Sequence, residues 1–135
     1  MNADLTLSRV QQILAAVLGV DPQRAAPEAS LTDDLDAESI DFVDILFRIE
    51  QEFGLKIDRD TLIAQDYFRD PQFFEDGKLT EAGIEAFRQR YQFTKIDGIK
   101  PGQSGREVVA HLLTVQTLVD LIDHVRSSRA GSGPI

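Results

Sequence analysis

The chain has 135 residues and 15.0 kDa, with 42% hydrophobic and 27% charged residues, which suits one small globular domain. Its 14 Lys and Arg against 23 Asp and Glu give a formal net charge of −9. Such a surface disfavours nucleic acid and anionic membranes, because phosphate binding needs clustered cations. The chain has no cysteine, which excludes disulfides, thiolate metal sites and cysteine nucleophiles.

The chain has no apolar run of transmembrane length. Its first residues, MNADLTLSRV, lack the basic region, apolar core and cleavage site of a secretory signal. We therefore expect a cytoplasmic protein without membrane insertion.

A first helix is predicted from apolar residues at helical spacing. These residues are Leu7, Val10, Leu14 and Val17. Thr6 or Ser8 is the candidate N-cap, and Gly19 is the expected stop. Residues 20–32 contain two prolines and no period, so we expect a loop over the core, held by Leu31 and Leu35.

A second helix is predicted from Ser39 to Phe53, ending at Gly54. Two apolar stripes run along it. The first stripe consists of Phe42, Leu46, Ile49 and Phe53, and the second of Ile40, Val43 and Phe47. Core packing needs only one stripe, so the second one indicates a docking surface for partners with apolar pockets.

The middle of the chain predicts shorter helices. Asp60 to Tyr67 forms a third helix, with Asp58 or Asp60 as its cap and Pro71 as an interruption. An Asp76-Gly77 turn follows. Thr80 then opens a segment in which Ile84, Phe87 and Tyr91 share one face.

The last third predicts a loop and two helices. GIKPGQSG, residues 98–105, is a loop, and Ser104 is the cap of a helix that follows. Thr114 is the cap of the last helix, whose core stripe consists of Val115, Leu118, Ile122 and Val125. No alternating run requires a sheet, so the predicted fold class is all-α.

Several familiar sites are disfavoured. The glycines near Lys100 lack the spacing of a phosphate-binding P-loop, so we interpret them as a connector. His111 and His124 are the only histidines and no HExxH spacing is present, so we expect no metal site. Ser39 does not sit in a GxSxG motif, so we expect no catalytic residue and no enzyme activity.

Ser39 has two open interpretations. It can cap the helix that starts at Ile40, or its hydroxyl can be a covalent attachment point. Asp41 and Asp44 share a face near the helix start, beside the second apolar stripe. Acids around an apolar strip are typical of a surface that docks to partners with basic rims.

The stretch from Asp33 to Ile57 resembles the helix that carries the prosthetic group in acyl carrier proteins. The family pattern has a glycine, any residue, then Asp-Ser-Leu, an acidic amphipathic helix and Glu-Phe-Gly. Here it becomes DAESI at residues 36–40 and EFG at residues 52–54, followed by LKI. Leu7 to Val17 resembles the family's first helix, and Thr114 to Val125 resembles its last.

The sequence departs from that pattern in three places. Asp36 replaces the glycine, which is tolerable because aspartate adopts left-handed turn geometry at modest cost. Glu38 replaces the aspartate before the serine. Residues 62–113 replace a short helix and loop, and their aromatic residues predict an insertion folded against the domain.

The resemblance implies a four-helix bundle with an additional helical insertion before the last helix. We expect one carrier domain over residues 1–128, with the insertion at about 62–113 and a disordered tail at 129–135. It also implies that a transferase attaches 4′-phosphopantetheine from coenzyme A to Ser39, whose arm then holds acyl chains as thioesters. The surface expected to meet partners consists of Glu38, Ile40, Asp41, Val43, Asp44, Phe47 and Glu50.

The implied partners are a phosphopantetheinyl transferase and acyl-transferring and ketosynthase-type enzymes, which would meet a monomeric carrier. Fatty-acid, specialised-lipid or polyketide biosynthesis is the expected setting, and discrete bacterial carriers for specialised lipids are the most similar. Three alternatives stay open: an unmodified helical interaction module, an aminoacyl or peptidyl carrier of peptide synthesis, and a small hydrolase using Ser39.

Overall fold

The computed structural model describes residues 3–132, with side chains for residues 5–127. The elements in chain order are α1 (Ala3–Leu18), the 3-10 turn η1 (Pro22–Arg24), α2 (Ser39–Phe53), α3 (Arg59–Leu62), α4 (Gln65–Arg69), β1 (Phe74–Glu75), β2 (Lys78–Leu79), α5 (Glu81–Arg90), α6 (Gly105–Leu112) and α7 (Val115–Ser132). The all-α prediction is confirmed, since the strands among the described residues form only a two-stranded hairpin.

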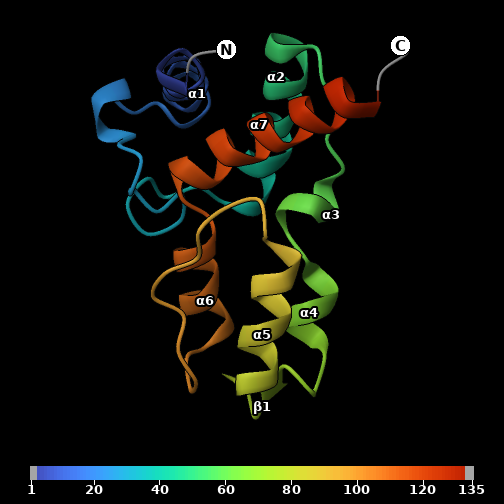
Figure 1. Cartoon of the computed structure of the whole chain (residues 1–135). Helices are drawn as coiled ribbons and strands as arrows, with labels where there is room; N and C mark the ends of the chain where they lie inside the picture. Colours follow the sequence, from blue (N-terminus) through green and yellow to red (C-terminus); the bar gives the residue numbers. More distant parts are fainter. Residues whose placement is uncertain (1–2, 133–135) are drawn as a thin grey trace.

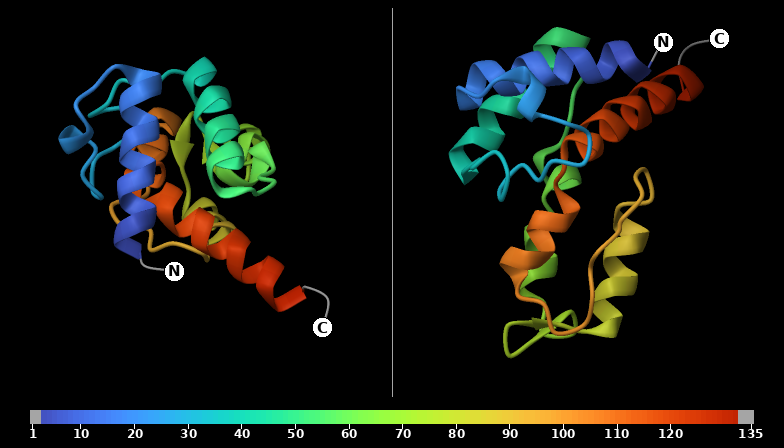
Figure 2. Two further views of the ribbon diagram at one scale, coloured as in Figure 1. Left: turned by 90° about the horizontal axis from the view of Figure 1, so that it is seen from above. Right: turned by 90° about the vertical axis from the view of Figure 1, so that its left-hand side faces the viewer.

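Helices α1, α2 and α7 form one end of the molecule, and α4, α5 and α6 form the other (Figure 1). Helix α1 packs against both α2 and α7. All three helices contribute to the buried cluster; its members include Val10, Leu14, Ile45, Ile49, Leu118, Leu121 and Ile122. The right-hand view of Figure 2 shows the same arrangement, with α4 to α6 extending away from α1 and α2.

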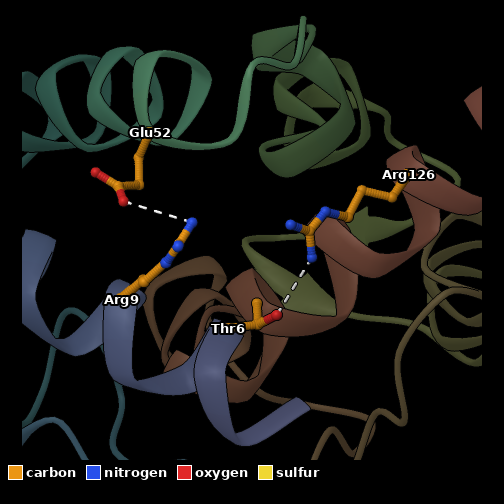
Figure 3. Close-up of polar contacts among 4 residues, drawn as sticks. All are labelled: Thr6, Arg9, Glu52 and Arg126. Atoms are coloured by element: carbon orange, nitrogen blue, oxygen red, sulfur yellow. Dashed lines mark hydrogen bonds and ion pairs between the residues drawn. The ribbon is translucent and has the colours of Figure 1, made fainter. Parts of the chain in front are cut away.

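Helix α1 begins earlier than the sequence predicted, so Thr6 and Ser8 are not its cap. Thr6 lies inside the helix at 1% exposure, where its hydroxyl accepts a hydrogen bond from Arg126 of α7 at 3.4 Å. Arg9, one turn further on, reaches Glu52 of α2 at 3.6 Å. Figure 3 shows that these two contacts link α1 to its two neighbours. The threonine therefore serves helix packing rather than helix initiation.

Residues 20–38 cross between α1 and α2 as expected, mostly without regular structure. Leu31 and Leu35 are buried, at 0% and 3% exposure. The Leu31 amide donates to the carbonyl of Leu113, and the Val115 amide donates to the carbonyl of Ala29. The long loop is thereby fixed against the start of α7.

The predicted third helix is broken in two, at Ile63 and Ala64. Asp58 caps α3, as expected, by accepting from the Asp60 amide at 3.0 Å. The break follows from tertiary contacts, because the buried Tyr91 hydroxyl donates to the Leu62 carbonyl at 2.6 Å and accepts from the Ala64 amide. Backbone groups that bond a side chain at this point are not available to continue the helix.

The predicted Asp76-Gly77 turn joins β1 and β2, a hairpin that the sequence did not predict. Both turn residues have positive φ, 52° and 77°, as a two-residue hairpin turn of this type requires. The predicted caps are confirmed next: Thr80 accepts from Gly83, Ser104 from Glu107, and Thr114 from Thr117.

The insertion has an aromatic centre at Phe87, which is fully buried. Its ring lies 5.1 to 6.2 Å, centroid to centroid, from four other rings. They belong to Tyr67, Phe68, Phe74 and Tyr91. Phe93 stacks on His124 of α7, and Thr94 donates to Asp120 at 2.7 Å. These two contacts join the folded insertion to α7.

Helix α7 continues to Ser132, so part of the tail expected at 129–135 is helical. The remainder of that expected tail, residues 133–135, lies outside the described residues. In the described part of the chain, no helix has the length and apolar character needed to cross a membrane.

Candidate functional site

Ser39 is the first residue of α2, and its side chain is exposed. The capping contact belongs to its neighbours, because the Glu38 amide donates to the Asp41 carboxylate at 2.8 Å. No side chain among residues 5–127 hydrogen bonds to the Ser39 hydroxyl. The interpretation of Ser39 as the helix cap is therefore wrong, and its hydroxyl is exposed to solvent.

The turn ahead of Ser39 is held in place from inside the molecule. Asp36 has a φ of 58°, the left-handed geometry expected of it. The residues on either side, Leu35 and Ala37, are buried. The Ala37 amide donates to the Leu31 carbonyl at 2.8 Å, and the Asp36 amide to the Thr32 carbonyl at 3.1 Å. The start of α2 is thus fixed while Ser39 faces solvent.

The second apolar stripe of α2 is uncovered. Ile40, Val43 and Phe47 are 74%, 46% and 57% exposed. On the other face of the same helix, Phe42, Ile45, Leu46 and Ile49 are buried. A single amphipathic helix therefore supplies both the core and an exposed apolar strip beside Ser39.

The acidic residues around the strip differ in exposure and in their hydrogen-bond partners. Glu38 is exposed. Asp44 is also exposed and pairs with Arg48 at 3.1 Å, a contact between partly solvated groups that contributes little to stability. Asp41 is occupied by the capping contact. Glu50 is half-buried and accepts from the Ile57 amide at 2.8 Å, so it fixes the chain after α2.

A groove of about 770 Å³ runs beside Ser39. One part of its lining comes from the turn and the start of α2, and another from α3, α4 and α6. Arg59 of α3 and Arg106 of α6 are the cationic residues that line it. The half-buried Ile63 and Val109 supply apolar surface. The insertion, through α6, therefore forms part of the site.

Arg59, Arg106 and Val109 were not predicted to be site residues. Arg106 follows a glycine-rich loop far along the chain from Ser39, and the sequence carries no pattern that joins them. Only the path of the insertion brings α6 to the groove.

Neither histidine lines the groove. His124 stacks on Phe93, and the Nδ1 atom of His111 lies against Gly98, where a Cβ would be only 2.6 Å away. A serine hydrolase needs a base within reach of its nucleophile. Among the described residues, no three His, Cys, Asp or Glu residues gather as a metal site would require. The groove thus presents an exposed serine hydroxyl together with carboxylates and arginines, and no histidine.

Ser39 and the start of α2 lie in a region that matches known proteins. A family model described as "Phosphopantetheine attachment site" matches residues 8–67, and an acyl carrier protein of Thermosynechococcus vestitus is 44% identical over 57 residues. Those residues make up 42% of this chain and 70% of that protein. The chain belongs to the acyl carrier protein family.

Other acyl carrier proteins are similar to this chain at a slightly lower identity. The acyl carrier protein of Rubrobacter xylanophilus is 40% identical over 57 residues, covering 42% of this chain and 70% of that protein. The acyl carrier protein AcpXL of Rhizobium meliloti is also 40% identical over 57 residues, covering 42% and 60%. Acyl carrier proteins use phosphopantetheine and are carriers rather than enzymes. Most of the insertion lies beyond the match at residues 8–67.

Proposed function

We propose that Ser39 carries the 4′-phosphopantetheine group and that the chain is an acyl carrier of fatty-acid, specialised-lipid or polyketide biosynthesis. The observation that carries this proposal is the exposed Ser39 hydroxyl, free of hydrogen bonds to described residues and located within the matched region. The free hydroxyl lies at the start of a 15-residue helix, where the backbone dipole favours an attached phosphate.

The surroundings of Ser39 fit that group. The groove beside it has a volume in the range of about 300–1,000 Å³ that is usual for ligand sites. Arg59 and Arg106 offer guanidinium donors, and Ile63 and Val109 offer apolar surface. When bound, the group supplies a thiol at the end of a flexible arm, on which an acyl chain is held as a thioester.

In the attachment reaction this chain supplies only the nucleophile, the Ser39 hydroxyl. The Ser39 oxygen forms a bond to the phosphorus of coenzyme A that bears the pantetheine, the pyrophosphate bond breaks, and adenosine 3′,5′-bisphosphate leaves. The hydroxyl proton is lost to a base. Because no histidine lines the groove, we expect the transferase to supply that base.

The partner surface in this proposal is the exposed strip of Ile40, Val43 and Phe47, with Glu38 and Asp44 beside it. An exposed apolar strip among carboxylates suits partners with a basic rim around an apolar pocket. The partners are the transferase and acyl-transferring or ketosynthase-type enzymes, which a monomeric carrier would meet in the cytoplasm. Binding should weaken as salt rises, because charge contributes to the encounter.

We expect Ser39→Ala to abolish loading. The protein is incubated with coenzyme A and a broad-specificity phosphopantetheinyl transferase, and intact mass and free thiol are measured. The wild type should gain one phosphopantetheinyl mass and one thiol, and the absence of cysteine makes the thiol assay unambiguous. The Ser39→Ala variant should gain neither while keeping its stability within about 0.5 kcal/mol, because the side chain is exposed and unbonded.

Ser8→Ala is the matched control, since Ser8 is an exposed serine on α1, outside the groove. This variant should load as the wild type does. Loading that persists in Ser39→Ala would move the attachment site to another residue. A wild type that stays unloaded with several transferases, including one from the source organism, would favour the unmodified interaction module.

A further inference from the structure

The insertion contributes helix α6 to the groove beside Ser39, which raises the question of what this added wall holds. Arg106, Val109 and Leu113 all line the groove, and all belong to the segment from Gly105 to Leu113. The match to the family ends at residue 67, so this wall is a feature of the insertion. The groove reaches from the attachment point to an element that the matched family region does not include.

The groove contains two arginines, although the chain as a whole is strongly acidic. Asp33, Asp36 and Glu38 line it, as expected of a protein with a net charge of −9. Arg59 and Arg106 line it as well, and neither guanidinium forms an ion pair or hydrogen bond with any described residue. Two unpaired arginines in one groove are available for a ligand with anionic or carbonyl oxygens.

The apolar part of the groove is also incompletely covered. Ile63 from the α3–α4 break and Val109 from α6 are each half-buried and line the groove together with the buried Leu113. A ligand for this groove therefore combines oxygen acceptors with aliphatic segments. A phosphodiester followed by amides and methyl and methylene groups, the chemistry of the pantetheine arm, has both features, and its attachment point at Ser39 lines the same groove.

We propose that the groove is a resting site for the arm, in which Arg59 and Arg106 donate to its phosphodiester and amide oxygens while Ile63 and Val109 cover its aliphatic part. This inference rests on the proposed attachment at Ser39. The insertion then acts as a wall that holds the arm against the carrier between encounters. The site must be weak, because an enzyme has to withdraw the arm to use it.

The test compares the loaded wild type with a loaded Arg59→Gln/Arg106→Gln double variant. The control is Arg69→Gln/Arg88→Gln, which removes the same charge from exposed arginines of α4 and α5 outside the groove. The arm's thiol is the only one on the protein, so its rate of alkylation by neutral iodoacetamide measures its exposure. A resting site that is filled half to nine-tenths of the time slows alkylation by about two- to tenfold.

We expect the Arg59/Arg106 double variant to be alkylated about two- to tenfold faster than the wild type and the control. Charge alone predicts the opposite, because loss of nearby cations raises the thiol pKa and leaves less reactive thiolate. Amide NMR gives a second readout that does not depend on the variants. Loading the wild type should shift the amide signals of Ile63, Arg106 and Val109.

Equal alkylation rates in all three loaded proteins, with NMR changes confined to residues around Ser39, would overturn the resting site while leaving the attachment intact. Intact mass is measured first on every sample. If the wild type gains no group, the proposed attachment fails and the resting site fails with it. If only the Arg59/Arg106 variant fails to load, the resting site is tested by NMR on the unloaded and loaded wild type. Shifts at Ile63, Arg106 and Val109 on loading support it, and changes confined to residues around Ser39 overturn it.

Discussion

At the scale of single residues, Asp36 shows how the site depends on backbone geometry. It has a φ of 58° three residues before Ser39, where most side chains are strained. Asp and Asn tolerate this geometry better than other residues with a Cβ, and glycine tolerates it without strain. The buried residues on each side prevent the turn from relaxing, so the cost of a poorly suited residue falls on the stability of the fold.

We expect Asp36→Ala to lower the free energy of unfolding by about 1 kcal/mol, the usual cost of a left-handed residue. Asp36→Gly should remain within about 0.5 kcal/mol of the wild type, because relief of strain offsets the greater freedom of the unfolded chain. Urea denaturation measures both. Asp36→Asn removes the charge and keeps the tolerance for this turn, so a loss as large as that of the alanine variant would assign the effect to charge instead.

At the scale of elements, helix α2 performs separate tasks on its two faces. Phe42 is 4% exposed and belongs to the core, whereas Phe47 is 57% exposed on the strip beside Ser39. The same residue type on the same helix therefore contributes to stability at one position and is free for partners at the other. Gly54, with a φ of 65°, ends the helix directly after Phe53, the last residue of the first stripe.

We expect Phe42→Ala and Phe47→Ala to separate these tasks. The first should cost about 3–5 kcal/mol of unfolding free energy, the usual value for a buried phenylalanine. The second should change stability by less than about 0.5 kcal/mol. It should lower the kcat/KM of phosphopantetheine transfer about tenfold, the effect of roughly 1.4 kcal/mol of lost contact energy. Unaltered transfer to the Phe47 variant would place the transferase contact elsewhere.

At the scale of the whole molecule, Tyr91 ties the insertion to the carrier. It lies at the end of α5, 1% exposed, and its hydroxyl bonds to the backbone at Leu62 and Ala64. Burial raises the pKa of Tyr91 from 10.0 to about 12, because the ionised form would lose its hydration, while the contact with Ala64 opposes the shift. Ionisation of the phenol would therefore lower the stability of this junction.

This pKa predicts a loss of stability at alkaline pH. Between pH 10 and 12 the unfolded tyrosine loses its proton while the folded one keeps it, so stability falls as pH rises through that window. A shift of this size corresponds to about 2–3 kcal/mol. Tyr91→Phe should cost about 1–2 kcal/mol at pH 8, by leaving the Leu62 carbonyl without its donor. Urea denaturation at several pH values should show the gap between the two proteins closing above pH 10; parallel curves would contradict the assignment.

Features encoded by adjacent residues were predictable from the sequence. The caps at Asp58, Thr80, Ser104 and Thr114 and the stop at Gly54 follow from local hydrogen-bonding chemistry, and the two stripes of α2 follow from helical spacing. Features that depend on contacts between distant residues were not predictable from the sequence. The break between α3 and α4 depends on Tyr91, and the groove depends on where the insertion places α6.

The position of α7 has a consequence for biosynthesis of the protein. Arg126 bonds Thr6 across 120 positions of the chain, so α1 leaves the ribosome long before its partner helix exists. The insertion, whose contacts are more local, can fold while α7 is still being made. Because α2 is held in place by α1, and α1 in turn by α7, an enzyme that recognises the finished bundle has no substrate on the nascent chain. We therefore expect the carrier to be modified only after α7 has left the ribosome.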